Sequence, residues 1–268
     1  MPAVSGAETR AAPAPAGFRG VALSALLAGL CPLIPLPLVD QWALTLVRRR
    51  AVGDVLRAAG LAPTWMQVRI LAGEQPGHRG CLPGVVAWAV AKTLFYVLKK
   101  LFRTLVFVLT LHEAVRRTAE LFSEAYLLRH AAGIGAAAAA LAEGDPGAWR
   151  VRAAVAAATR EVDPSPVLRT VNAALAGSWG LLRRGARRLA RALRRRRAVA
   201  TAEAVPVAEE ADLLGGVVDR LTEALWLQGD YRRRLEERFA AHWAAAPLYY
   251  DPGPARPRDD RDPGRPGS

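Results

Sequence analysis

Residues 85–132 read VVAWAVAKTLFYVLKKLFRTLVFVLTLHEAVRRTAELFSEAYLLRHAA, and this stretch contains neither glycine nor proline. A single helix of that length would be about 70 Å long, which is too long for a compact domain. We expect a break at Thr110, because Thr110-Leu111-His112-Glu113 has the form of a capping box. The stretch therefore predicts one helix over 85–109 and another over 111–131.

The rest of the chain has the same helical character. Alanine, leucine and arginine dominate, all three favour helices, and no long stretch alternates apolar and polar residues as a half-buried strand does. Glycines and prolines divide the remaining chain into helices expected at about 18–30, 37–59, 62–72, 145–162, 166–198, 213–228 and 230–243. The sequence thus predicts an all-α fold, a multi-helix bundle with a long basic amphipathic helix and a C-terminal helical hairpin.

Composition also predicts the domain organisation. Residues 1–17 are rich in alanine, proline and glycine and predict a flexible N-terminal lead. Residues 252–268 cannot form a core and predict a disordered tail. Prolines at 164 and 166 separate a helical body, 18–162, from a second segment, 163–251, which holds the long basic helix and the hairpin.

The positive charge is concentrated in one segment. The chain has 37 basic and 24 acidic residues, a net charge of +13, and all but three of the basic residues are arginine. Nine of the arginines lie within residues 183–197, which contain no acid, and we call these residues the arginine segment. Without them the balance is 28 to 24, so the rest of the protein carries a net charge of only +4.

The arginine segment is the main candidate binding site. Arginine pairs phosphate oxygens two at a time, so such a stripe can bind an anionic lipid surface or nucleic acid. The alternative is a solvated helix face enriched in arginine by biased codon usage. The candidate residues are Arg183, Arg184, Arg187, Arg188, Arg191, Arg194, Arg195, Arg196 and Arg197.

Two apolar segments bear on membrane association. Residues 20–39 carry no charge, but three prolines shorten the helix to about 13 residues, which predicts a core helix or a re-entrant hairpin rather than a span. Helix 85–109 combines a broad apolar face with a narrow basic stripe, formed by Lys92, Lys99, Lys100 and Arg103. Central charges disfavour a simple span. An interfacial helix and a core helix with one solvated edge both fit this pattern.

A proline-rich entry precedes the second helix. Residues 34–40 read IPLPLVD and are followed by an amphipathic helix that ends at Gly60. Over residues 24–60 this pattern resembles bacterial membrane-associated helical domains of the YcjF and EcsC type. The resemblance implies membrane association in a bacterium, on the cytoplasmic side of the inner membrane or in the cytoplasm. Those families have no assigned catalytic residues, so it implies none here.

No catalytic, cofactor or metal motif is complete. His112-Glu113 begins like a zinc-protease helix, but Arg116 stands where the second histidine ligand would be. Glu113, Glu120 and Glu124 share a helix face without the histidines of a di-metal bundle, and Arg116 and Arg117 predict ion pairs instead. The sequence therefore predicts no enzyme and no cofactor.

One acidic residue stands at the edge of a long apolar run. Asp40 either complements the positive end of the second helix or is a buried structural anchor that meets an arginine. The leading hypothesis is a non-enzymatic protein bound to anionic membrane lipid. The alternative is a helical module that uses the same stripe for nucleic-acid phosphates or for a protein partner, and nucleic acid is disfavoured because aromatic and polar base readers are missing.

Overall fold

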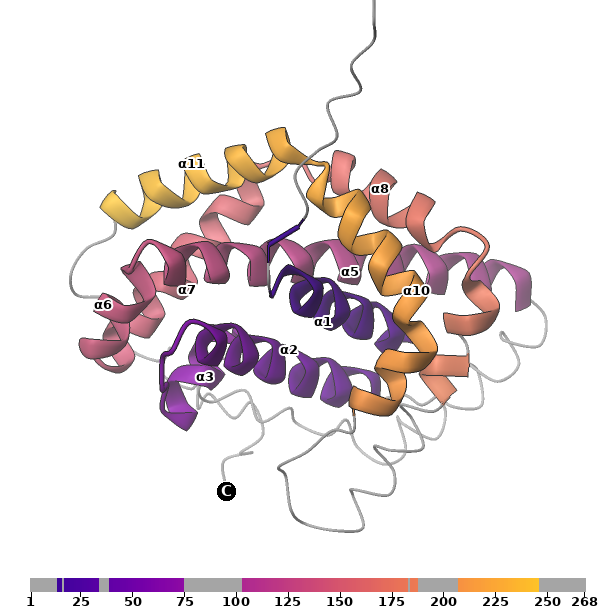
Figure 1. Cartoon of the computed structure of the whole chain (residues 1–268), viewed down its shortest axis with the longest axis horizontal. Helices are drawn as coiled ribbons and strands as arrows, with labels where there is room; N and C mark the ends of the chain where they lie inside the picture. Colours follow the sequence, from indigo (N-terminus) through magenta and orange to yellow (C-terminus); the bar gives the residue numbers. More distant parts are fainter. Residues whose placement is uncertain are drawn as a thin grey trace, which may run out of the picture.

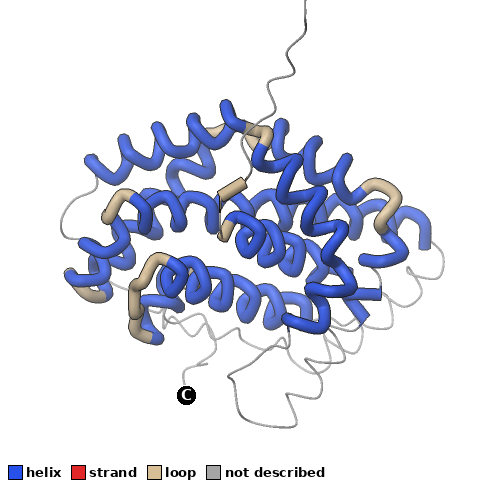
Figure 2. Tube along the Cα trace, in the orientation of Figure 1, coloured by secondary structure: helices blue, strands red, loops and turns tan. Residues whose placement is uncertain are grey.

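The computed structural model describes residues 14–15, 17–33, 39–74, 103–182, 184–187 and 207–245, with side chains except at 39–41, 103–108 and 207–213. This part of the chain contains helices and no strand, which confirms the all-α prediction (Figure 2). The elements are α1 (Phe18–Leu30), the 3-10 turn η1 (Cys31–Leu33), α2 (Val39–Ala58), α3 (Trp65–Leu71), α5 (Arg103–Gly133), α6 (Ala136–Ala142), α7 (Asp145–Glu161), α8 (Ser165–Leu175), α10 (Val207–Trp226) and α11 (Gly229–Ala245).

Helix α5 is the centre of the fold. It runs along the long axis of the molecule behind α1 and contacts α1, α2, α6, α7, α8 and α11 (Figure 1). Helix α1 packs on it more extensively than any other and also contacts α2 and α10. Helices from both ends of the chain therefore share one hydrophobic core.

An aromatic cluster fills the core where α1, α5 and the end of α10 meet. Phe18 is fully buried, and its ring centroid lies 5.7 Å from that of Phe122, 6.3 Å from that of Tyr126 and 5.2 Å from that of Trp226. All three pairs are edge-to-face, an arrangement that adds about 0.5–1.5 kcal/mol per pair to the burial of the rings. This cluster joins the N-terminal helix to the C-terminal segment.

Helices α1 and α5 approach closely because Gly29 has no side chain. A Cβ atom at this position would lie 2.0 Å from Thr118 Oγ1 and 2.8 Å from the carbonyl oxygen of Ala114. Thr118 is buried, and its hydroxyl donates to that same carbonyl at 2.9 Å. A larger residue at Gly29 would push the two helices apart.

The break predicted at Thr110 is wrong. Helix α5 continues through Thr110, so the described part of the predicted helix 85–109 is joined to the helix predicted over 111–131. A capping threonine needs an extended backbone outside the helix. Thr64 meets this requirement with ψ 160°, and its hydroxyl accepts from the Gln67 amide while the Gln67 side chain accepts from the Thr64 amide.

The single long helix predicted over 166–198 is interrupted after α8. Ala176 is extended, with ψ 136°, and Gly177 has a left-handed φ of +75°, which only glycine adopts readily. Helix resumes at residues 179–182 and 184–187. The predicted apolar stripe nevertheless faces the core on both sides of the break, with buried Val171, Leu175, Ser178, Leu182 and Ala186.

The last two helices differ from a packed hairpin. They follow each other through Leu227 and Gln228, close to the predicted junction. However, α10 packs on α8 and α1, whereas α11 packs on α7 and α5, and the two diverge from their junction in Figure 1. The two helices therefore pack on other helices rather than on each other.

Some predictions concern residues outside the described part. They include the disordered tail 252–268, most of the lead 1–17, and helix 85–109 up to residue 102. Buried residues from Phe18 to Phe239 belong to one hydrophobic cluster. The domain boundary between 18–162 and 163–251 stays a prediction.

Candidate functional site

The arginine segment begins as an amphipathic helix. Arg184 and Arg187 are exposed, whereas Gly185 and Ala186 are buried. A Cβ atom at Gly185 would lie 3.4 Å from the side chain of Leu30, so this face of the helix contacts the core closely. Within the described part of the chain, neither Arg184 nor Arg187 forms an ion pair. The other seven candidates, Arg183, Arg188, Arg191, Arg194, Arg195, Arg196 and Arg197, lie outside the described residues.

Several arginines of the helical body, in contrast, are ion-paired with acidic residues. Each member of the triplet 48–50 pairs with a different acid, Arg48 with Glu124 at 3.8 Å, Arg49 with Glu74, and Arg50 with Asp54 at 3.3 Å. Arg152 also donates to Glu124 at 3.0 Å, so this carboxylate bridges α2, α5 and α7. These arginines are part of the internal structure of the body.

The remaining basic and acidic candidates are placed only by their backbone or not at all. Arg103 is the first residue of α5 and Asp40 the second of α2, and the side chains of both lie outside the described part. Lys92, Lys99 and Lys100 lie outside it altogether. The basic stripe of helix 85–109 and the anchor role of Asp40 stay predictions.

The ion pairs predicted on α5 are confirmed. Arg116 Nε lies 2.9 Å from Glu113 and its Nη1 lies 2.6 Å from Glu120, and Arg117 Nε lies 2.7 Å from Glu113. Hydrogen bonds from Arg116 lower the pKa of Glu113 despite its partial burial, with further contributions from Arg117. Among the described residues, no three His, Cys, Asp or Glu side chains are grouped to hold a metal ion.

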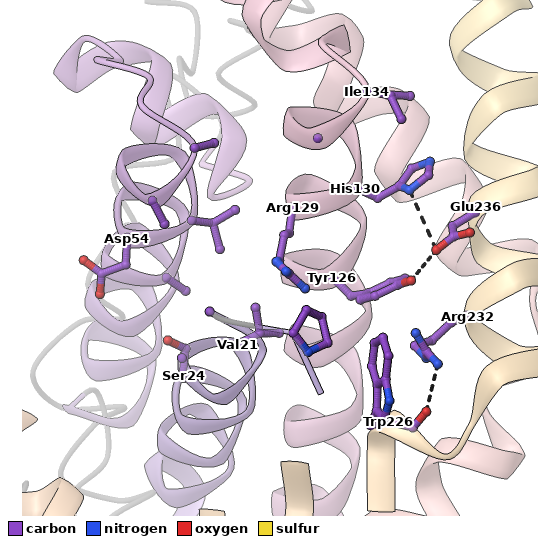
Figure 3. A pocket seen from close by; sticks show the side chains of 18 residues that line it. Val21, Ser24, Asp54, Tyr126, Arg129, His130, Ile134, Trp226, Arg232 and Glu236 are labelled. Atoms are coloured by element: carbon purple, nitrogen blue, oxygen red, sulfur yellow. Dashed lines mark hydrogen bonds and ion pairs between the residues drawn. The ribbon is translucent and has the colours of Figure 1, made fainter. Parts of the chain in front are cut away.

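A pocket of about 760 Å³ lies between α1, α2, α5, the end of α10 and α11 (Figure 3). Its volume lies in the range of small-molecule sites. Small and apolar residues line the part between α1, α2 and α5, among them Val21, Ala51 and Val55. The opposite part, beside α11, is polar and aromatic. In Figure 3, Asp54 stands on α2, away from this polar end.

A carboxylate with two neighbours forms part of the polar end. The Tyr126 hydroxyl donates a hydrogen bond to Glu236, and His130 Nδ1 lies 3.7 Å from the same carboxylate (Figure 3). Burial, together with the hydrogen bond and negative charge of Glu236, raises the pKa of Tyr126 to about 12. The tyrosine is therefore neutral at physiological pH, and Glu236 is the anionic group of this cluster.

Arg232 supplies a positive charge beside this cluster. Its guanidinium lies over the Trp226 ring, 3.8 Å from the centroid, and Nη2 donates to the Trp226 carbonyl at 2.8 Å. Its Nε atom is buried and has no hydrogen-bond partner among the residues that the structure describes. Arg232 also forms no ion pair with an acid in the described part of the chain, although Glu236 is on the next turn of the same helix. Arg129, from α5, is a second arginine that lines the pocket.

The sequence did not single out this pocket. Helical spacing places Tyr126 and His130 on one face of α5, and Arg232 and Glu236 on one face of α11. Nothing in the spacing says that these two faces meet, because Tyr126 and Glu236 are 110 residues apart. The one signal in the sequence is that Tyr126 and His130 are four residues apart near the end of the helix predicted over 111–131.

No single described helix is both long and apolar enough to cross a bilayer. The segments Leu109–Gly133 and Ala136–Ala142 reach the required length and hydropathy only together, across a bend of 82°.

Comparisons with known proteins give no relatives on which a function could be based. The chain matches no protein-family model, and neither a curated protein nor a solved structure is similar to it. The function must therefore be argued from the residues and their geometry.

Proposed function

We propose that the chain is a non-enzymatic protein that binds the surface of an anionic membrane through the arginine segment. The observation that carries the proposal is the exposure of Arg184 and Arg187 without an ion-pair partner in the described part of the chain, on a helix whose other face is buried. Exposed guanidinium groups on a fixed helix are available to lipid phosphates, each of which arginine can bind with two parallel hydrogen bonds.

The charge of the whole segment makes a lipid surface a suitable partner. Basic residues near an anionic leaflet contribute about 1 kcal/mol each, and the segment contains nine arginines. Helix 85–109, with its basic stripe of Lys92, Lys99, Lys100 and Arg103, is proposed as a second contact with the same surface. A bacterial protein of this kind would be found on the cytoplasmic side of the inner membrane.

Flotation of the full chain with vesicles tests the proposal. Vesicles containing phosphatidylglycerol should carry the protein to the top of a gradient at low salt, and neutral phosphatidylcholine vesicles should not. The double variant Arg184→Gln/Arg187→Gln should float less. The matched control, Arg233→Gln/Arg238→Gln, removes two exposed arginines of α11 that are ion-paired, and it should float like the unmodified chain.

Two outcomes would contradict the proposal. One is failure of the unmodified chain to float with anionic vesicles at low salt. The other is a salt-dependent shift of DNA or RNA in a gel without any affinity for lipid, which would favour the nucleic-acid alternative.

A further inference from the structure

The pocket between α1, α2, α5 and α11 has two chemically different ends. Its inner walls carry short or apolar side chains, and Gly20 and Gly133 leave room where other helices would place a side chain. A Cβ atom at either glycine would meet no atom within 4 Å. The hollow is therefore a consequence of residue size along three helices, and it can hold an aliphatic group.

The polar end contains two arginines, Arg129 and Arg232, and one acid, Glu236. The other carboxylate of the lining, Asp54, is paired with Arg50 and with Arg57, at 3.3 Å and 2.6 Å. It therefore does not cancel the charge at the polar end.

Arg232 is preorganised to receive an anion. Its stacking on Trp226 and its bond to the Trp226 carbonyl hold the guanidinium in place. Among the described residues its Nε atom has no hydrogen-bond partner, and a carboxylate is the partner that a planar guanidinium binds with two parallel hydrogen bonds. Holding the arginine in advance reduces the ordering cost that a ligand would otherwise meet.

We propose that this pocket binds a single-chain amphiphile with a carboxylate head, such as a free medium-chain fatty acid. The carboxylate lies at Arg232 and the aliphatic chain lies between Val21, Val55 and the small residues of α1 and α2. A carboxylate carries one negative charge, which the guanidinium of Arg232 balances, whereas a doubly charged phosphate exceeds it. The inference does not depend on the proposed membrane contact of the arginine segment.

Isothermal titration calorimetry of the full chain with decanoate, below the concentration at which decanoate aggregates, tests the proposal. One saturable site per chain is expected. Decanol has a chain of the same length without a carboxylate, and lysophosphatidic acid has a phosphate head. Both should bind roughly tenfold more weakly or worse, because decanol cannot form the ion pair and the phosphate carries more charge than Arg232 balances.

Three variants separate binding from folding. Gly20→Leu places a side chain in the pocket at a helical position with free space, so it should abolish decanoate binding while the Tm stays the same or rises. Arg232→Gln should weaken binding roughly tenfold or more. Arg233→Gln removes the same charge from the neighbouring position, which does not line the pocket, and should bind decanoate like the unmodified chain.

The proposal is overturned if decanoate gives no saturable heat with the unmodified chain. It is equally overturned if a folded Gly20→Leu variant binds decanoate unchanged, or if decanol binds as tightly as decanoate. Since Gly20→Leu retains every polar group of the site, loss of binding in that variant places the ligand in the hollow even if Arg232→Gln proves unstable.

Discussion

The triplet at positions 48–50 and residues 184–187 of the arginine segment are both helical and rich in arginine, but their arginines have different surroundings. In the triplet, every guanidinium has an acidic partner, and two of these acids come from other parts of the chain. At Arg184 and Arg187 the side chains are exposed, and the described part of the chain supplies no acid to pair with them. The difference lies in the surroundings rather than in the arginines.

This comparison shows how a basic sequence should be interpreted. An arginine next to a partly buried carboxylate contributes to folding, because separating the two would leave a charge without a partner. An arginine in solvent contributes little to folding and keeps its donors for an external anion.

The largest effect is expected at Glu124, the acid shared by Arg48 and Arg152. Its side chain is 17% exposed, so Glu124→Gln leaves two partly buried arginines without a counter-charge. We expect a loss of about 2–3 kcal/mol in the free energy of unfolding, less than for a fully buried pair. Urea denaturation measures it, with Glu237→Gln on the exposed face of α11 as control. Equal stability of the two variants would show that the triplet is not structural.

The next effect concerns binding rather than folding. Arg184→Gln/Arg187→Gln should weaken binding to anionic vesicles by about 2 kcal/mol, roughly 30-fold, at low salt. Its unfolding midpoint in urea should match that of the unmodified chain, because both side chains are exposed. A clear loss of stability in this variant would mean that the segment belongs with the paired arginines.

A smaller effect, dependent on pH, is expected at Glu74. Burial alone would raise the pKa of Glu74, but hydrogen bonds and charge from Arg49 and Arg69 outweigh it and lower the pKa below the ordinary value of 4.5. The lowered pKa means that this stabilisation is fully present above about pH 4.5 and is lost as the pH falls through the folded-state value. Glu74→Gln should cost roughly 1 kcal/mol at pH 7.

The pH dependence of this stability loss distinguishes the loss of the Glu74 ion pairs from a packing defect. The stability difference between Glu74→Gln and the unmodified chain should shrink as the pH is lowered below 4.5, and urea midpoints across that range measure it. A difference that stays constant with pH would mean that the ion pairs of Glu74 do not stabilise the fold.

The smallest effect is expected at an exposed pair. Arg233 lies 3.0 Å from Asp230, but the two side chains are 66% and 85% exposed. Arg233→Gln should therefore change the free energy of unfolding by less than about 0.5 kcal/mol. A larger loss by urea denaturation would show that exposure does not separate structural arginines from free ones in this protein.

Local sequence signals predicted most of the helices but not how they meet. The first helix, 18–30, was predicted with the bounds that α1 has, because proline stops it. The helix predicted over 145–162 is α7, Asp145–Glu161. The break at Thr110 was wrong because a capping signature acts only where an extended residue precedes the start of a helix, as at Thr64.

The candidate sites were accessible to sequence reasoning to different degrees. The arginine segment can be predicted because its nine arginines lie close together in the sequence. The pocket is not, since its polar end combines Tyr126 with Arg232 and Glu236, more than 100 residues further along the chain. Only tertiary packing brings these helices together.

The burial of Gly185 and Ala186 has an entropic consequence for the two arginines that flank them, Arg184 and Arg187. Fixing the backbone of a disordered residue costs about 1–2 kcal/mol, and a flexible basic tail must meet that cost whenever it settles on a surface. Arg184 and Arg187 project from a turn of helix already docked on Leu30 and Leu214. Folding of the core has already ordered the backbone of this part of the binding surface. An anion that binds the two arginines therefore restricts only their side-chain rotamers.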